Sequence, residues 1–428
     1  MNLIINFFKN YFFLFLYFGL FFINSIQLID RSAQFWFSIS LVNIFLFIYL
    51  YLNKYLNKRL INSLFRDRIV ISYLLFLLAC SLSFINTFNV SESLIVLFRY
   101  FTTFSSIVLL SIYLLDLSYK FFALILAFFF LLELSFTFNG YLSIISQTVY
   151  SFEFANYLAG IGANKNISAA LYCMQLPFLF FLAIYFKNYV YKLIFSILLV
   201  FSFYNIFILG SRTALIIILA QSVTFLLLLL FSNKKLKSIS SSFVESFSTW
   251  FLPLFISLLI YSSSLSTSNN SSLVSRVSSI QFDNVSVSER LKFYNYTIDY
   301  IVSNPITPLG IGNWKISSVD WDSSLLNGYT VPYHAHNDFL ELAAEITFFG
   351  ALLYFLVFFF TAFQLIKSLN DSKTLMDFYF YLALLLSGTA FFIDSLFNFP
   401  NSRPLQVMIL IFSISFTIVS KLKARNHE

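Results

Sequence analysis

Residues 189–231, YVYKLIFSILLVFSFYNIFILGSRTALIIILAQSVTFLLLLLF, form two apolar runs separated by the polar turn Gly210-Ser-Arg-Thr213. Each run has about 20 residues, which is the length of a helix that crosses a lipid bilayer. The short turn predicts that the two helices are antiparallel neighbours. A helix pair this apolar needs lipid rather than water around most of its surface.

Similar apolar runs recur along the whole chain. The protein has 428 residues, of which 59% are hydrophobic and only 11% are charged, and its mean hydropathy is +0.83. Soluble domains carry roughly 25% charged residues, so this composition excludes a water-soluble fold. The sequence predicts an all-α, polytopic membrane protein that forms a single membrane domain over residues 1–428. About twelve spans are expected, at 11–28, 34–52, 69–85, 93–115, 120–137, 167–186, 189–209, 213–231, 247–265, 339–366, 376–397 and 404–420.

The basic residues predict how the helices are oriented. If the N-terminus is cytoplasmic, most of the 26 Lys and Arg residues fall in cytoplasmic segments, as the positive-inside rule requires. We therefore expect a bacterial inner-membrane protein with both termini in the cytoplasm. The net charge of +7 fits loops that face anionic membrane lipids, and we expect no nucleic-acid partner. Cys80 and Cys173 lie inside apolar runs and do not suggest a disulfide or a metal site.

The largest aqueous segment is the predicted outer loop at residues 266–338. Within it, the sequence from Ser286 onward predicts a helix with Ser286 or Ser288 as its N-cap. The spacing of the apolar residues Leu291, Tyr294, Ile298 and Ile301 predicts that they form one face of this helix and pack on the membrane or on the helical bundle. Asn304-Pro305 is expected to end the helix.

Ionisable residues within or beside the spans gather at the predicted outer face. Such residues are costly in a membrane and are usually functional. A transporter coupled to protons or ions places charged groups near the middle of the bilayer. The inner half of this bundle has nothing comparable, so the pattern favours a polar site that opens outward. The residues concerned are Arg99, Glu133, Arg212, Arg290, His334, His336, Glu341, Glu345 and Asp394.

Each of these residues also has a purely structural interpretation. Arg212 can anchor a turn at the level of the lipid headgroups, and Arg290 can be a solvated residue near a helix start. Glu341 and Glu345, four residues apart on one helix face, can interact with the helix dipole. The histidine pair is harder to explain structurally, because histidine titrates near neutral pH and suits general-base catalysis. No further Cys or His completes a zinc site, so we predict no metal.

The segment from His334 to Gly350 resembles the signature of the O-antigen ligase and O-antigen polymerase superfamily. In the ligases, that signature is His, a polar residue, nine residues, Gly, two residues, and then Gly, Thr or Tyr. Here His336-Asn337 supplies its start and Gly350 supplies its end. Thr347 replaces the middle glycine, at which the signature implies tight helix packing.

Further segments resemble the same superfamily in the same order. Gly210-Ser-Arg212-Thr-Ala214 is similar to its arginine turn, and Arg290, followed by Asn304-Pro305 and Leu309-Gly-Ile-Gly-Asn313, is similar to its large periplasmic loop. Asn164-Lys-Asn166-Ile-Ser-Ala169 is similar to the segment that enters its sixth helix. The resemblance covers roughly residues 140–360.

The resemblance implies a GT-C-like membrane glycosyltransferase that acts on the periplasmic face. Such an enzyme takes a glycan from an undecaprenyl diphosphate carrier. A ligase passes it to lipid A–core, and a polymerase passes it to another carrier-linked repeat unit. The donor already carries its leaving group, so we expect no nucleotide and no other cofactor. The expected partners are this donor, the lipid A–core or glycan acceptor, and membrane lipids.

The resemblance also implies a role for each candidate residue. Arginine forms planar, permanently charged hydrogen bonds to phosphate oxygens, and such donors stabilise a departing diphosphate. We expect Arg212 and Arg290 to bind the diphosphate, His336 to act as base with inversion, His334 and Asn337 to orient the site, and Arg99, Glu341 and Glu345 to support binding. The partial signature favours a ligase. The alternatives are a polymerase, a protein O-oligosaccharyltransferase, a glycolipid transporter and a structural scaffold.

Overall fold

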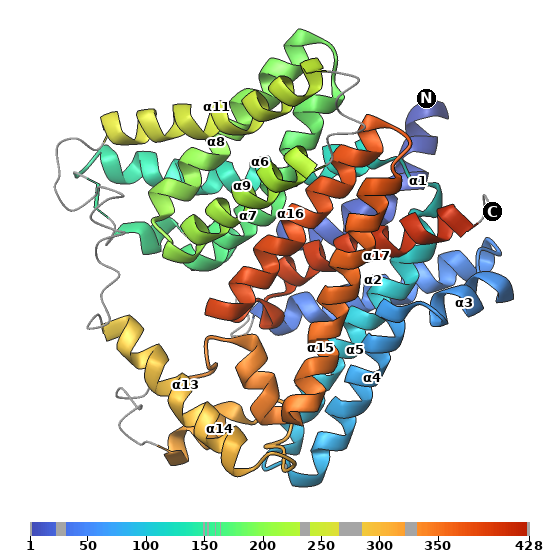
Figure 1. The fold of residues 1–428 in the computed structure, drawn as a ribbon, viewed down its shortest axis with the longest axis vertical. Helices are drawn as coiled ribbons and strands as arrows, with labels where there is room; N and C mark the ends of the chain where they lie inside the picture. Colours follow the sequence, from blue (N-terminus) through green and yellow to red (C-terminus); the bar gives the residue numbers. More distant parts are fainter. Residues whose placement is uncertain are drawn as a thin grey trace. The chain divides into compact units, whose positions relative to one another are not determined.

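A computed structural model describes residues 2–22, 31–148, 150–151, 154–158, 160–162, 164–231, 240–264, 285–321 and 332–425. In these ranges the chain forms α-helices, short 3₁₀ helices and turns (Figure 1), which confirms the predicted all-α fold. The α-helices are α1 (Asn2–Gly19), α2 (Arg31–Leu52), α3 (Lys58–Phe65), α4 (Arg68–Leu82), α5 (Val90–Tyr113), α6 (Tyr119–Ile145), α7 (Lys165–Tyr185), α8 (Tyr189–Leu209), α9 (Arg212–Phe231), α11 (Ser240–Ser264), α13 (Val285–Ser303), α14 (Trp314–Trp321), α15 (Asp338–Asp371), α16 (Leu375–Phe397) and α17 (Pro404–Arg425).

Among the described residues, eleven helices are long and apolar enough to cross a membrane. They coincide with eleven of the predicted spans, so the chain is a multi-pass membrane protein. The first predicted span, 11–28, differs, because its apolar helical part covers only Tyr11–Phe22. Residues 23–30 lie outside the described ranges. Another difference is that α6 continues to Ile145, beyond the predicted end at residue 137.

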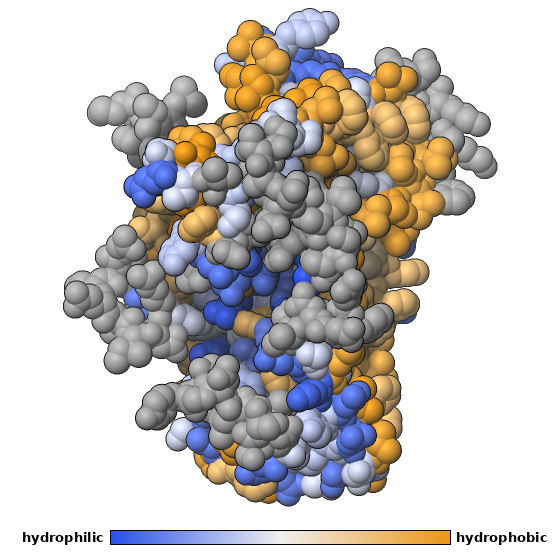
Figure 2. All heavy atoms as spheres, turned by 90° about the vertical axis from the view of Figure 1, so that its left-hand side faces the viewer, coloured by the Kyte–Doolittle hydropathy of each residue, from blue (hydrophilic) through white to orange (hydrophobic). Residues whose placement is uncertain are grey.

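Large apolar side chains are exposed on the sides of the helices. Figure 2 shows them as broad orange areas on one face of the molecule. On α2, for example, Phe37 is 62% exposed and Phe45 is 58% exposed. Exposed apolar patches of this extent are not tolerated in water, and they mark a surface that lipid covers.

The helices group into two compact units. Unit 1 consists of Met1–Ile26, Asp116–Ile280 and Leu365–Ile393. Unit 2 consists of Gln27–Leu115, Gln281–Gln364 and Asp394–Glu428. Helices α15 and α16 contribute residues to both.

Unit 1 is built around α7, whose residues from Ser168 to Ile184 are all buried. This helix is apolar on every side, as expected for a helix surrounded by others, and it contacts α6, α8, α9 and α11. On α9, the amide of Gln221 donates to the carbonyls of Cys173, at 2.9 Å, and Leu386, at 3.0 Å. These hydrogen bonds tie α9 to α7 and α16, and such polar contacts hold helices together where lipid provides no hydrophobic driving force.

Unit 2 is built around α5 and α17. Helix α5 contacts α2, α4 and α17. The side chain of Asn43 on α2 donates to the carbonyl of Thr102, at 3.1 Å, and to Ser105 Oγ, at 2.9 Å. In the same unit, Lys421 on α17 forms an ion pair with Asp67, whose carboxylate also caps α4.

Helices α13 and α14 belong to unit 2 and lie in the described part of the large loop (Figure 1). Helix α13 ends at Ser303, directly before Asn304-Pro305, as predicted. Two residues of its predicted apolar face, Leu291 (39% exposed) and Ile298 (43% exposed), do not pack on the bundle, and their packing on the membrane stays a prediction. The buried side chains are instead Phe293 and Thr297, which pack toward α14 and the start of α15.

Candidate functional site

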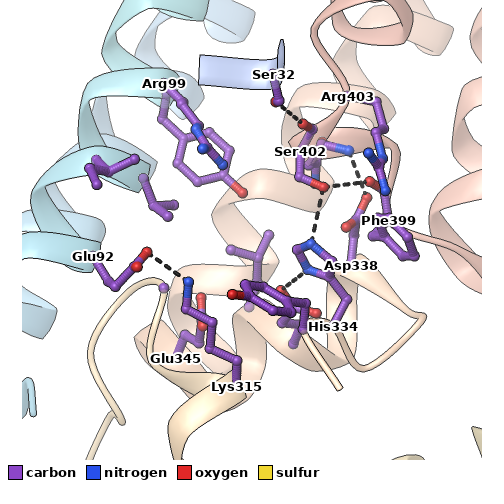
Figure 3. Close-up of a pocket in the computed structure, with 18 of the residues that line it drawn as sticks. Ser32, Glu92, Arg99, Lys315, His334, Asp338, Glu345, Phe399, Ser402 and Arg403 are labelled. Carbon is purple, nitrogen blue, oxygen red and sulfur yellow. Dashed lines mark hydrogen bonds and ion pairs between the residues drawn. The ribbon is translucent and has the colours of Figure 1, made fainter. Parts of the chain in front are cut away.

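A cavity of about 720 Å³ lies in unit 2, where α2, α5, α14 and α15 meet the turn between α16 and α17 (Figure 3). Its volume is within the range typical of small-molecule sites. Polar and charged side chains line it together with the rings of Tyr100, Tyr333 and Phe399. The charged and imidazole groups in its wall are Glu92, Arg99, Lys315, His334, Asp338, Glu341, Glu345 and Arg403. Four of these, Arg99, His334, Glu341 and Glu345, are candidates from the sequence.

Helix α15 is broken directly after Glu345, which lines the cavity. Ile346 and Thr347 are non-helical, with Thr347 at φ 73° and ψ 161°. The break releases two carbonyls that a regular helix would use internally. The backbone N–H of Leu309 donates to the carbonyl of Ala344, and that of Gly310 donates to the carbonyl of Glu345, both at 3.0 Å. The loop at 309–313 therefore completes the hydrogen bonding of α15.

The same loop packs tightly against the start of α5. Asn313 is completely buried, and its side chain accepts from the N–H of Asn89 at 2.8 Å and donates to Thr87 Oγ1 and Ser93 Oγ, both at 2.8 Å. Gly310 has φ 89°, and a Cβ atom there would lie 2.6 Å from Thr87 Oγ1. Only glycine fits this position, which explains the glycine at residue 310.

Two carboxylates hold the first turn of α14 at the cavity. Glu345, which is 3% exposed, accepts from the backbone N–H of Trp314 at 2.9 Å. Glu92 on α5 forms an ion pair with Lys315 at 2.7 Å. Glu345 thus lines the cavity and also fixes α14. Its predicted support of substrate binding stays a prediction, and its contact with α14 was not predicted.

His334 faces the cavity in a fixed orientation. Its Nδ1 lies 2.9 Å from Glu341 Oε1, and the other carboxylate oxygen accepts from the N–H of Ala335 at 2.7 Å. Its ring stacks on Phe399, with centroids 4.3 Å apart. Its Nε2 lies 3.3 Å from Ser402 Oγ. An imidazole oriented by a carboxylate on one nitrogen can accept a proton on the other.

His336 lies beside the cavity and is not part of its lining. Its backbone has φ 58°, a left-handed conformation that is uncommon outside glycine, and the hydroxyl of Tyr294 donates to its carbonyl at 2.9 Å. The ring stacks against Phe293 and meets the edge of Phe399. Its Nδ1 is buried and has no hydrogen-bond partner among the described residues. Burial lowers the pKa of His336 to about 3, assisted by the charges of Arg290, His334 and Arg403.

Asn337 and Arg290 act on His336 in different ways, one through the backbone and the other through its charge. Asn337 caps α15, because its side-chain oxygen accepts from the N–H groups of Phe339 and Leu340 at 3.1 Å. Capping holds the His336-Asn337 pair at the helix start. Arg290 is a half-buried residue of α13, and its positive charge acts on His336 and on Asp394.

Arg212 belongs to unit 1, whereas the other seven predicted residues belong to unit 2. It is the first residue of α9 and is half-buried. The preceding helix, α8, ends at Gly210, which has φ 59° and forms the left-handed C-cap. Its proposed cooperation with the other residues stays a prediction.

Several lining residues were not predicted as part of the site. Arg403, Asp338, Lys315 and Glu92 all face the cavity. Arg403 carries a recognisable signal, since an arginine on the predicted outer side directly before a span runs against the positive-inside rule. The others lie in polar segments, where sequence alone cannot distinguish a site residue from a solvated one. Within the described ranges, no group of three or more His, Cys, Asp or Glu side chains is arranged to hold a metal ion.

Residues 197–355 match the model of a family described as O-antigen ligase. The match supports the O-antigen ligase and polymerase superfamily and confirms the resemblance inferred from the sequence. It covers the second part of α8, then α9, α11, α13 and α14, and the first part of α15, and so contains every predicted site residue except Arg99. A comparison with curated proteins finds no match.

Proposed function

We propose that this multi-pass membrane protein, with its O-antigen ligase segment at residues 197–355, transfers a glycan from undecaprenyl diphosphate to lipid A–core. We place it in the bacterial inner membrane, with both termini in the cytoplasm and the site on the periplasmic side. The observation that carries the proposal is the cavity at the start of α15, because it combines the carboxylate-oriented imidazole of His334, inside the matched segment, with two arginines, Arg99 and Arg403, that lie outside this segment in the sequence.

The reaction needs two kinds of group. An acceptor hydroxyl attacks the anomeric carbon of the donor and forms the new glycosidic bond, while the bond from that carbon to the diphosphate breaks. The diphosphate leaves with the electron pair, and its charge needs stabilisation by Arg212 and Arg290. The hydroxyl proton passes to an imidazole. Attack from the face opposite the diphosphate inverts the anomeric centre.

We propose that His336 accepts the proton of the acceptor hydroxyl. Its place in the matched signature supports this assignment, as does its buried Nδ1, which has no hydrogen-bond partner among the described residues. Its pKa of about 3 keeps the ring neutral and able to accept a proton, but it makes the ring a weak base. The positive charge of Arg290 contributes to that low pKa. A donor diphosphate bound at Arg290 offsets this charge and raises the pKa of His336, so the base gains strength when the donor is present.

The remaining candidates have supporting roles in this proposal. His334, held by Glu341, orients the acceptor at the cavity wall. Asn337 fixes the start of α15, Glu345 fixes α14, and Arg99 contributes positive charge on the α5 side.

The test is the glycolipid ladder of a deletion strain that carries either the wild-type gene or His336→Ala. We expect the deletion and His336→Ala to remove polymer from lipid A–core while long chains remain on the polyprenyl carrier. His427→Ala, outside the matched segment, serves as the control, with protein levels compared by immunoblot. A single repeat on the core would identify a polymerase instead. An unchanged ladder would reject both reactions and favour protein glycosylation or transport.

A further inference from the structure

The turn between α16 and α17 is held in place by two other helices, α15 and α2. It contains a short 3₁₀ helix, Pro400–Ser402. The backbone N–H of Asn401 donates to Asp338 on α15 at 3.2 Å, and the hydroxyl of Tyr354 donates to the Asn401 side chain. From α2, Ser32 donates to the carbonyl of Ser402 at 3.3 Å. A turn fixed at this many points presents its next side chain in a defined position.

That next side chain is Arg403, which lies in the cavity wall (Figure 3). Its guanidinium lies over the ring of Phe399, 4.7 Å from the centroid, and this contact limits its movement. Arg99 lines the same cavity from α5. Two arginines from different segments, α5 and the α16–α17 turn, therefore line the same cavity. Each guanidinium group carries five N–H donors.

The acidic residues of the cavity already have partners within the protein. Glu341 accepts from Ala335 and contacts His334, Glu345 accepts from Trp314, Glu92 pairs with Lys315, and Asp338 accepts from Asn401. These contacts therefore stabilise the wall itself. A ligand in the cavity meets carboxylates that are engaged and guanidinium groups that suit an anion.

We propose that Arg99 and Arg403 bind a phosphate group of a substrate in this cavity. The inference rests on the proposed function and deepens it, because it names Arg99 and Arg403 as phosphate-binding residues in addition to Arg212 and Arg290. The planar guanidinium matches two phosphate oxygens at once, and the volume of about 720 Å³ accommodates a phosphate with an attached sugar.

A phosphate at Arg403 also influences the proposed base. The charge of Arg403 is one of the causes that lower the pKa of His336. An anion bound there offsets this charge, so it strengthens the base, as a diphosphate at Arg290 would. Binding at this pair and proton transfer at His336 are therefore coupled.

The phosphate can come from either substrate, namely from the diphosphate of the donor lipid or from a phosphorylated sugar of the acceptor glycolipid. Binding of each probe to the full chain in lipid nanodiscs separates these sources. The donor probe is polyprenyl diphosphate without a glycan. The acceptor probe is lipid A–core, used before and after phosphatase treatment.

We expect Arg403→Gln and Arg99→Gln each to weaken binding of one probe about tenfold or more, because each loses charged hydrogen bonds. Weaker binding of the diphosphate probe assigns the pair to the donor. Weaker binding of intact lipid A–core, with no effect on the dephosphorylated form, assigns it to the acceptor. Lys292→Gln removes an exposed positive charge of α13 outside the cavity and is the matched control.

Arg403→Lys keeps the charge, loses the planar donor pair and is the second variant if Arg403→Gln does not fold. It is expected to bind with intermediate affinity. If the Arg99 and Arg403 variants bind both probes as tightly as Lys292→Gln does, the inference is wrong. The result is independent of the proposed reaction, because binding is measured without transfer. An unchanged ladder in the deletion strain would reject the reaction and leave this binding result standing.

Discussion

Glu341 contacts His334 with one carboxylate oxygen and the neighbouring Ala335 with the other. One oxygen lies 2.9 Å from the imidazole Nδ1, and the other accepts the N–H of Ala335 at 2.7 Å. A neutral imidazole in this contact carries its proton on Nδ1, which leaves Nε2 as the acceptor facing Ser402 and the cavity. A single carboxylate thus fixes both the orientation and the tautomer of the ring.

Glu341→Gln is expected to lower the kcat of glycan transfer about tenfold, because the amide of glutamine can donate to Nδ1 and reverse the tautomer. The pH profile of kcat should shift as well, which a purely structural effect would not produce. The measurement is transfer by reconstituted protein across a pH series. Glu289→Gln, on the exposed side of α13, is the control and should match wild type. An unaltered rate and pH profile would contradict the orienting role of Glu341.

The low pKa of His336 predicts a specific dependence of stability on pH. Between pH 6.5 and about 3, the unfolded chain binds a proton on this imidazole that the folded chain does not bind. The free energy of unfolding therefore falls as pH falls through this window, by at most about 2 kcal/mol from pH 6.5 to about 5. His336→Gln should reduce this slope, measured as the unfolding temperature against pH. His427→Gln should keep it, and equal slopes for all three proteins would refute the prediction.

Thr347 occupies the position where the ligase signature has glycine, and its φ of 73° lies in a region that β-branched residues rarely adopt. Thr347→Gly is therefore expected to stabilise the protein by about 1 kcal/mol, because it relieves this strain. Thr361→Gly, in the regular part of α15, should instead destabilise it by about 1 kcal/mol. Thermal unfolding in detergent compares the two. A lower unfolding temperature for Thr347→Gly would show that the threonine is not strained.

Asn313→Ala should loosen the contact between the 309–313 loop and α5. The change removes the partners of Asn89, Thr87 and Ser93 in a buried position, and it is expected to cost about 3 kcal/mol. Hydrogen exchange should rise at the amides of residues 87–93. Asn295→Ala, which alters an exposed residue of α13, should leave that exchange unchanged. If both variants exchange alike, the loop is held by other contacts.

Hydropathy predicted the membrane spans well, because a bilayer imposes one length and one composition on every crossing helix. The end of α13 was also predictable, since Asn304-Pro305 stops a helix. Its buried face was not. Leu291 and Ile298 are exposed, while Phe293 and Thr297 are buried. A helix with apolar residues on several sides gives no periodicity that selects one of them.

The residues of the site were predicted only in part. The family signature led to His334, His336 and Glu341, all of which lie at or beside the cavity. It gave no indication of the break in α15, because Thr347 stands in place of the glycine. Arg403 lies beyond the matched segment and reaches the cavity only through the fold of the α16–α17 turn.

The break in α15 has a consequence for biosynthesis. The carbonyls of Ala344 and Glu345 obtain their donors from Leu309 and Gly310, which are translated earlier. A carbonyl without a donor in the hydrocarbon layer costs several kcal/mol. The 309–313 loop is synthesised before α15, so the donors for both carbonyls are already present when α15 forms. Deleting this loop should impair membrane insertion of α15 and of the two helices that follow it.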